Sequence, residues 1–391
     1  MYWLWQILRS GVFTGLEVLV LVHLCRSFAP LGRLHRRWLI GAGVALFVAN
    51  FAYKPVKWFL YPTPESSALH SFLYRSYVTA FFLIGVSALL LGAALVLHYW
   101  WERWRIPRPE ERHMMSAEHA APGLTRRAFL SQGLAYGAAG GLSLSTGASA
   151  WAVLTSENKG VDVRRVRVPL SEQHRHLHGL RIAQITDIHV GPFLRGEELE
   201  KLLRQVVREG ADLIVHTGDH YNMEREYADE GARSLSLLRA PHGAYAVPGN
   251  HDRYFGVEKF EAIFEQKGIR VLRASSLEVP GISGLVLHGI NDPESKLPAS
   301  FPEVDALAKN LDASKFNLLL SHRPEAFDHA RGFDLTLAGH THGGQVRVPL
   351  PFGGALAPAR LIHPYDWGLF EKEGRRLYVS SGLGYAGPPV R

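Results

Sequence analysis

Five short segments of the chain combine histidine with aspartate or asparagine, and none of them contains cysteine. They are Asp187-Ile188-His189, Gly218-Asp219, Gly249-Asn250-His251-Asp252, Ser321-His322 and Gly339-His340-Thr341-His342. Imidazole and carboxylate ligands without thiolate suit Mn, Fe or Zn as catalytic ions. Two ligand types at positions i and i+2 can direct two side chains at one ion. These residue types and spacings therefore indicate a catalytic metal centre, provided that the fold brings the segments together.

Each segment follows a short apolar stretch that is typical of a buried strand. These strands are predicted at 180–186, 212–216, 243–247, 316–320 and 334–338. Helices are predicted at 196–208, 228–238, 257–266 and 303–309, and further strands at 269–272, 277–279, 285–289 and 376–380. Alternating strands and helices indicate an α/β core, and the consecutive strands indicate a second sheet. Because ligands bind at the carboxyl edge of such sheets, the five segments are expected to converge there.

Glycine directly precedes three of the candidate ligands, at Gly218, Gly249 and Gly339. Glycine adopts backbone conformations that other residues avoid. We therefore expect these glycines to supply the turns that aim the following side chains at the metals.

Taken together and in this order, the five segments resemble those of the calcineurin-like metallophosphoesterase superfamily. The segment 343–349, Gly-Gly-Gln-Val-Arg-Val-Pro, is similar to the bacterial membrane-anchored or exported phosphodiesterase branch. The resemblance covers residues 180–391. It implies a four-layer α-β-β-α sandwich for these residues and says nothing about the first three apolar runs. The hydropathy of the N-terminal third, described below, predicts a bundle of transmembrane helices that precedes the sandwich.

The resemblance also implies a role for each candidate residue at a site of two divalent ions (Mn, Fe or Zn). Asp187, His189 and His342 would hold the first ion, Asn250, His322 and His340 the second, and Asp219 would bridge them. A hydroxide between the two ions would attack the phosphorus. His251 would protonate the leaving oxygen or stabilise the charge on it, and Asp252 would orient its ring.

Two features depart from the pattern of these relatives. Where many relatives have an acidic or amide residue soon after the bridging aspartate, this chain has His220-Tyr221-Asn222, and we expect those side chains to shape substrate access. The sequence also ends at Pro388-Pro389-Val390-Arg391, which we interpret as one edge strand fewer than in these relatives, either naturally or by truncation.

The first third of the chain has the hydropathy pattern of a membrane protein. Apolar runs cover 10–25, 38–53, 77–101 and 129–154, and the last two are long enough to span a bilayer. The first two have 16 residues each, so buried helices of a soluble domain are the alternative for them. The predicted domains are a membrane region with three transmembrane helices at 1–127, a signal or anchor helix at 128–155, a linker at 156–179 and a metallophosphoesterase domain at 180–391.

The charge pattern predicts how the chain crosses the membrane. Residues 1–127 carry 14 basic and six acidic side chains, whereas the rest of the chain carries 29 and 30, so the net charge of +7 arises in the first third. The loops 26–37 and 102–127 hold four and six arginines, which the positive-inside rule assigns to the cytoplasm. The sequence thus predicts a multi-pass protein of the bacterial cytoplasmic membrane with an extracytoplasmic catalytic domain.

The sequence around Arg126 and Arg127, Thr-Arg-Arg-Ala-Phe-Leu, resembles a twin-arginine export signal and precedes a stretch of small residues. Its position after three apolar runs is unusual for such a signal. The alternative interpretation is a basic flank at a membrane edge. The export signal is preferred because it agrees with the orientation that the loop charges predict.

These observations favour a membrane-anchored dinuclear phosphoesterase, and more specifically a phosphodiesterase. Its substrate would be a phosphate ester that could be lipid-linked. A non-catalytic membrane receptor or scaffold of the same fold is one alternative. A hydrolase of nucleotide-diphosphate lipid precursors is another, which needs cytoplasmic access and so conflicts with the predicted topology. The sequence lacks a Gly-x-x-x-x-Gly-Lys loop, a Gly-x-Ser-x-Gly elbow and a His-Glu-x-x-His motif. The expected partners are the substrate and the lipid bilayer, without a specific nucleic acid.

Overall fold

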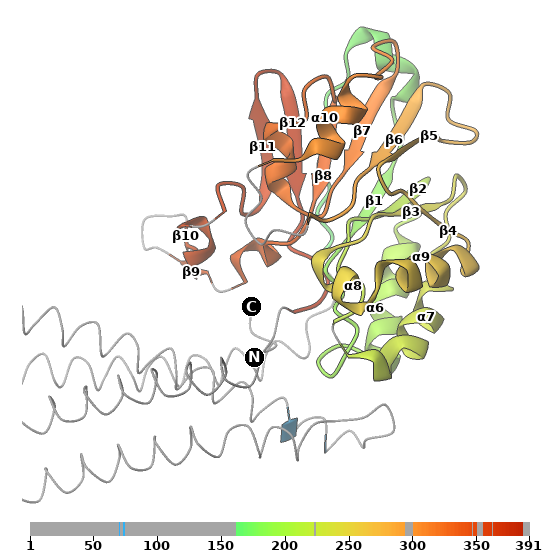
Figure 1. Cartoon of the computed structure of the whole chain (residues 1–391), viewed down its shortest axis with the longest axis vertical. Coiled ribbons are helices and arrows are strands. Elements are labelled where there is room, and N and C mark those ends of the chain that lie inside the picture. The colour runs from blue at the N-terminus through green and yellow to red at the C-terminus, as the bar shows by residue number, and fades with distance from the viewer. Residues whose placement is uncertain are drawn as a thin grey trace, which may run out of the picture. The chain divides into compact units, whose positions relative to one another are not determined.

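The structure, a computed structural model, describes residues 70, 73–74, 162–222, 224–293, 300–345, 347–349, 355–361 and 363–385 (Figure 1). All four apolar runs and the paired arginines lie outside these residues, so the predicted membrane bundle lies there too. Among the described residues, no helix combines the length and the apolar character that a membrane crossing requires.

A first sheet of four parallel strands holds the first three candidate segments. Its strands are β1 (Ile182–Ile185), β2 (Leu213–His216), β3 (Ala244–Ala246) and β4 (Ile269–Val271), in the order β1-β2-β3-β4. The connections contain α6 (Gly196–Arg208), α7 (Ala228–Leu235), α8 (Asn250–Phe255) and α9 (Val257–Gln266). Ile185 pairs with His216 and His216 with Ala246. The carboxyl ends of these three strands therefore lie side by side.

A second sheet of six strands holds the remaining candidates. Its order is β11-β12-β8-β7-β6-β5, formed by β5 (Ser275–Glu278), β6 (Leu285–Gly289), β7 (Phe316–Leu320), β8 (Leu335–Ala338), β11 (Gly368–Lys372) and β12 (Arg375–Val379). The four inner strands are parallel, and the two outer strands, β5 and β11, are antiparallel to their neighbours. Leu320 pairs with Leu337, so His322 and His340 follow adjacent strands at one edge.

Three apolar cores separate four layers of secondary structure. The first core packs α6, α7 and α9 against the first sheet, and it contains Leu203, Phe260 and Ile214. The second core lies between the two sheets, where Val215 meets residues of β6, β7 and β8. The third packs α10 (Pro302–Ala308) and the 3-10 helix Pro324–Asp328 against the outer face of the second sheet. Figure 1 shows α6, α7, α8 and α9 together beside β1 to β4.

Alternation along the strands explains these layers, since neighbouring side chains of a strand face opposite sides of the sheet. In β2, Ile214 belongs to the first core and Val215 to the second. In β7, Leu318 belongs to the second core and Leu319 to the third. The α/β class and the second sheet predicted from the sequence are confirmed.

Candidate metal centre

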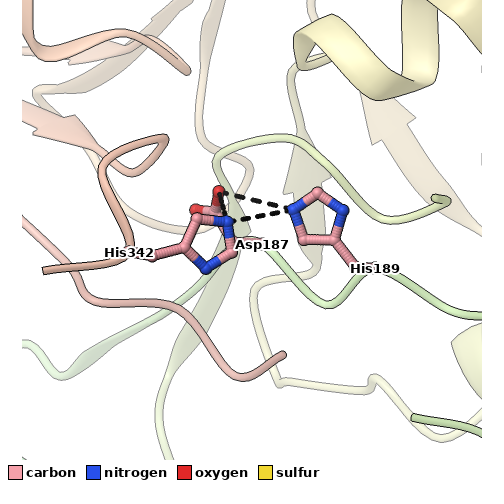
Figure 2. Close-up of side chains that lie close together, drawn as sticks. All are labelled: Asp187, His189 and His342. Atoms are coloured by element: carbon pink, nitrogen blue, oxygen red, sulfur yellow. Dashed lines mark hydrogen bonds and ion pairs between the residues drawn. The ribbon is translucent and has the colours of Figure 1, made fainter. Parts of the chain in front are cut away.

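Three side chains that are far apart in the sequence, two after β1 and one after β8, converge in one cluster. Figure 2 shows Asp187, His189 and His342 pointing at one another. The two Nε2 atoms of His189 and His342 lie 3.1 Å apart, and Oδ1 of Asp187 lies 3.3 Å from Nε2 of His342. All three side chains are buried. The predicted ligands of the first ion thus form a compact group that could hold a metal.

A second cluster lies around Nε2 of His322. This atom is 3.1 Å from Oδ1 of Asn250, 3.1 Å from Nδ1 of His340 and 3.2 Å from Oδ2 of Asp219. The structure therefore also brings together the residues predicted to bind the second ion. Asn250 offers a neutral oxygen, which keeps the negative charge of the cluster lower than a second carboxylate beside Asp219 would.

The Asp219 carboxylate belongs to both clusters. Its Oδ2 atom lies 3.2 Å from Nε2 of His322 and 3.5 Å from Nε2 of His189. One oxygen is thus within reach of both ligand groups, which is the arrangement that a shared ligand between two ions requires. Its other oxygen, Oδ1, accepts the backbone N–H of His251 at 2.8 Å, and this bond fixes the orientation of the carboxylate.

Five of the seven candidate ligands have a left-handed backbone. The φ angles are 51° at Asp187, 50° at His189, 56° at Asp219, 71° at His340 and 51° at His342. Non-glycine residues adopt this region uncommonly, and such residues concentrate at functional sites at a cost on the order of 1–3 kcal/mol each. The backbone strain is a second observation, separate from the side-chain distances, and it falls on five of the same candidate ligands.

The glycines act differently from the sequence expectation. Gly218 does adopt a left-handed conformation, with φ of 95°, but at Gly249 and Gly339 the constraint is space. A Cβ atom on Gly249 would lie 2.2 Å from Oδ1 of Asp219, and one on Gly339 would lie 2.3 Å from Oδ2 of Asp187. These two glycines therefore let backbone approach the ligand carboxylates.

Hydrogen bonds outside the two clusters fix the ligand orientations. Thr186 Oγ1 donates to Oδ2 of Asp187 at 2.6 Å, and the backbone N–H of His340 donates to the same oxygen at 3.0 Å. Nδ1 of His322 lies 2.9 Å from the carbonyl oxygen of Thr217. When Nδ1 donates there, Nε2 faces the cluster, as a metal-binding histidine requires.

The electrostatics of the site favour a cation. Burial is the largest cause that lowers the pKa of both His189 and His340. These rings are therefore neutral candidate ligands. Burial also lowers the pKa of His322, but the Asp219 carboxylate outweighs it and raises this pKa to about 10. Although burial alone would raise the pKa of Asp219, the charge of His322 lowers it. Positive charge is therefore strongly favoured beside Asp219, and a bound metal ion would supply it.

The residues present fit a pair of divalent ions. Nitrogen and oxygen lone pairs converge at 3.1–3.5 Å, and two neighbouring imidazole nitrogens cannot satisfy each other when both rings are neutral acceptors. Histidine, carboxylate and amide ligands suit Mn, Fe and Zn better than a thiolate-selective ion. Asp187, His189, His342 and Asp219 would hold one ion, and Asp219, Asn250, His322 and His340 the other.

His251 lies beside the clusters, and the described hydrogen bonds of Asp252 go to backbone groups, not to the His251 ring. The ring centroid of His251 is 4.6 Å from that of His189. The two Asp252 oxygens accept three backbone N–H groups, from His220, Tyr221 and Gly249, each at 3.0 Å. Nδ1 of His251 has no hydrogen-bond partner among the described residues. Asp252 thus fastens the backbone around the site, contrary to the ring-orienting role that the sequence suggested.

The residues that follow Asp219 also differ from expectation. His220 and Tyr221 are fully buried, and Tyr221 stacks on Phe255 with ring centroids 4.2 Å apart. Burial lowers the pKa of His220 to about 3, so it is a neutral core residue. Tyr221 belongs to the first core, and the His220 ring contacts Phe264 of that core, so these two buried side chains do not shape substrate access.

Sequence reasoning missed one charged pair next to the second cluster. Arg323 is buried, its Nε donates to Oδ1 of Asp292 at 2.8 Å, and its Nη1 lies 3.2 Å from Nε2 of His340. Its place directly after His322 is the one sequence signal that could have drawn attention to it. The guanidinium thus stands beside His340, and the Asp292 carboxylate balances its charge.

Comparison with known proteins identifies one family. The profile of the calcineurin-like phosphoesterases matches residues 180–344. An uncharacterized metallophosphoesterase of Aquifex aeolicus is 35% identical over 216 residues, which cover 54% of this chain and 80% of that protein. A Danio rerio protein named as a transmembrane protein with a metallophosphoesterase domain is 29% identical, over 58% of this chain and 53% of its own length.

The matches cover only part of each protein, and the similarity to solved structures is low. The chain covers 80% of the length of the Aquifex aeolicus protein but only 49% of a Caenorhabditis elegans relative that is 26% identical. It spans 56% of a Helicobacter pylori metallophosphoesterase that is 31% identical. Among solved structures, the NAD nucleotidase of Haemophilus influenzae is 16% identical with a TM-score of 0.36, and the match covers 53% of this chain and 45% of that one.

Proposed function

Because the chain belongs to the calcineurin-like phosphoesterase family and is thereby a metal-dependent phosphoester hydrolase, we propose that it is a membrane-anchored dinuclear phosphodiesterase. The observation that carries the proposal is the position of Asp219, whose Oδ2 lies within 3.5 Å of both ligand groups. A shared carboxylate places two ions close enough to act on one phosphoryl group.

The chain's own residues divide the work of hydrolysis. Two divalent ions held by the seven ligands would supply Lewis acidity to the phosphoryl oxygens and lower the pKa of an attacking water. Asn250 limits the negative charge that meets an anionic ester. His251, in ring contact with His189, donates a proton to the leaving oxygen as its bond to phosphorus breaks and the bond from the water oxygen forms.

The preference for a diester rests on the similarity of segment 343–349 to the exported phosphodiesterase branch. A diester has two ester oxygens, so the alcohol that leaves depends on which oxygen faces His251. The site geometry also accommodates a monoester, and the experiment below separates the two substrates. A lipid-linked diester is the natural substrate class if the domain is tethered beside a bilayer.

One described contact supports the proposed number of membrane crossings between the loop around Tyr74 and the domain. Tyr74 is buried, its ring centroid lies 5.6 Å from that of Phe193, and residues 62–75 belong to the same compact unit as residues 155–391. Segments that pack together lie on one side of a membrane. The chain would then cross the membrane an even number of times between Arg75 and Thr155, which fits two spans at 77–101 and 129–154.

The two alternatives fit less well. A non-catalytic scaffold would keep seven ligand positions and five left-handed residues, such as His340 with φ of 71°, at a stability cost without a use. A hydrolase of nucleotide-diphosphate lipid precursors would work on the cytoplasmic face, against the loop charges. Both alternatives give distinct results in the tests described here.

The proposed function is tested on the full chain in detergent, loaded in turn with Mn, Fe or Zn. We expect hydrolysis of bis(4-nitrophenyl) phosphate to exceed that of 4-nitrophenyl phosphate. Asp219→Asn should abolish hydrolysis of both esters, whereas Asp229→Asn, the same change at an exposed position of α7, should leave it unchanged. Metal binding without hydrolysis of either ester would favour the scaffold, and a higher rate on the monoester would refute the diester preference.

A further inference from the structure

An exposed aromatic side chain stands beside the proposed proton donor. Tyr254 is 49% exposed, the highest value among the large hydrophobic side chains of the described residues. Its ring centroid lies 6.3 Å from that of His251, with the planes at 78°. The two residues are three positions apart in α8, so they occupy the same face of the helix.

The helix that carries Tyr254 is fixed on both sides of the exposed ring. Before it, the backbone N–H of His251 donates to Oδ1 of Asp219, and Asp252 accepts the backbone N–H of Gly249. After it, the buried ring of Phe255 stacks on Tyr221. The backbone that carries Tyr254 is therefore fixed next to the site, and its ring projects from there into solvent.

The Tyr254 ring lies on the side of the site where the leaving group would leave. His251 contacts His189 of the first cluster and also Tyr254. A proton passed from His251 to the leaving oxygen puts the attached group next to the His251 ring. Among the described residues, the His251 ring also contacts the Tyr254 ring, and the Arg253 guanidinium carbon lies 5.2 Å from the Tyr254 centroid.

We propose that Tyr254 is a specificity-determining residue that binds a flat or apolar leaving group of the substrate. This inference rests on the proposed function, and it adds the class of the leaving group. An aromatic ring offers a flat apolar surface that stacks on planar groups and also contacts alkyl chains. The leaving alcohol would thus be an aryl or heterocyclic alcohol, or a long-chain lipid alcohol, in preference to a short hydrophilic one.

The test compares two diesters of methyl phosphate that differ in the leaving group. In methyl 4-nitrophenyl phosphate the leaving group is a flat ring, and in methyl trifluoroethyl phosphate it is small and has no ring. For the full chain with Tyr254→Ala, we expect KM for the nitrophenyl ester to rise about ten-fold, equivalent to about 1.4 kcal/mol, with kcat little changed. KM for the trifluoroethyl ester should stay the same, and Tyr254→Phe should retain the wild-type KM for both.

Controls separate this role from a structural one. Leu369→Ala removes an equally exposed apolar side chain from β11 and should change neither KM. Inhibition by decyl methyl phosphate tells the two leaving-group sources apart. A Tyr254→Ala protein that loses this inhibition indicates an alkyl-chain site, and one that keeps it indicates a site for planar groups.

Two outcomes would overturn the inference. One is an unchanged KM for the nitrophenyl ester in Tyr254→Ala, and the other is an equal rise of KM for both esters, which would mean that Tyr254 acts on the phosphate or on the fold. If the wild-type protein hydrolyses neither ester, it is the proposed function that fails. The two failures are therefore distinguishable in one set of measurements.

Discussion

Replacing Asp252 by asparagine should lower the free energy of unfolding. It should leave the preference between alkyl and nitrophenyl leaving groups unchanged. The carboxylate accepts three backbone N–H groups, two at Oδ1 from His220 and Tyr221 and one at Oδ2 from Gly249. An asparagine carbonyl can keep the first two, but its NH₂ group would then face the Gly249 N–H. One buried amide is left without an acceptor, which costs on the order of 1–3 kcal/mol.

The predicted size can be read as a melting temperature. For a domain of about 150–250 residues, 1 kcal/mol shifts Tm by about 2–4 °C, so a loss of about 2 kcal/mol lowers Tm by about 4–8 °C. The assay is thermal unfolding of the metal-loaded full chain, combined with rates on alkyl and nitrophenyl diesters. Asp328→Asn, which alters an exposed ion pair with Lys372, is the matched control and should shift Tm by about 2 °C or less.

The rates decide between the two roles of Asp252. Because it fastens the backbone that carries Asp219 and His251, its replacement should reduce the rates on both diesters by a similar factor. An unchanged Tm together with a selective loss on the alkyl diester would refute this reasoning. It would restore the view that Asp252 orients the His251 ring.

Four further predictions concern the metals, the proton donor, the glycines and the topology. Elemental analysis should find two metal ions per chain, and His342→Ala should bind about one fewer; a single ion at saturation in the wild type would contradict the shared ligand. His251→Asn should keep both ions and lose about 10²–10⁴-fold on alkyl diesters but less on nitrophenyl diesters, whereas equal losses would assign His251 another role. Gly249→Ala should abolish activity and lower metal content, because its Cβ would lie 2.2 Å from the Asp219 carboxylate; normal metal content would contradict this. A reporter fused to the C-terminus should be exported, and replacing Arg126 and Arg127 by lysine should block export; a cytoplasmic reporter in the wild type would reverse the topology.

The positions of strands and helices were largely predictable from the sequence. Periodicity gave α6 and α9 with the bounds that the structure has, and β6 and β7 likewise. It missed α8, which is only six residues long and has no apolar repeat. It also missed β11, although Glu373 and Gly374, both with positive φ, form the kind of turn that joins two antiparallel strands.

The convergence of the seven ligands was predictable for a physical reason, since the carboxyl ends of parallel strands meet at one edge. The role of Asp252 was not. Adjacency to His251 suggested that the two side chains meet, but neighbouring residues of a helix point in different directions. Similarly, polar residues after Asp219 looked like surface groups, whereas the first core takes up His220 and Tyr221. Backbone partners and layer boundaries decide these details, and no side-chain pattern encodes them.

The division of the ligands between the two sheets bears on when the protein acquires its metals. Asp187, His189, Asp219 and Asn250 come from the first sheet, and the three remaining histidines follow strands of the second. A ribosome adding about 5–20 residues per second needs roughly 5–20 seconds to proceed from Asn250 to His342. During that interval the nascent chain offers three of the four candidate ligands of the first ion and two of the four of the second. Full coordination of both ions would therefore wait until the second sheet closes, and the second ion, which lacks two ligands until then, would be chosen from the metal supply of the compartment in which that happens.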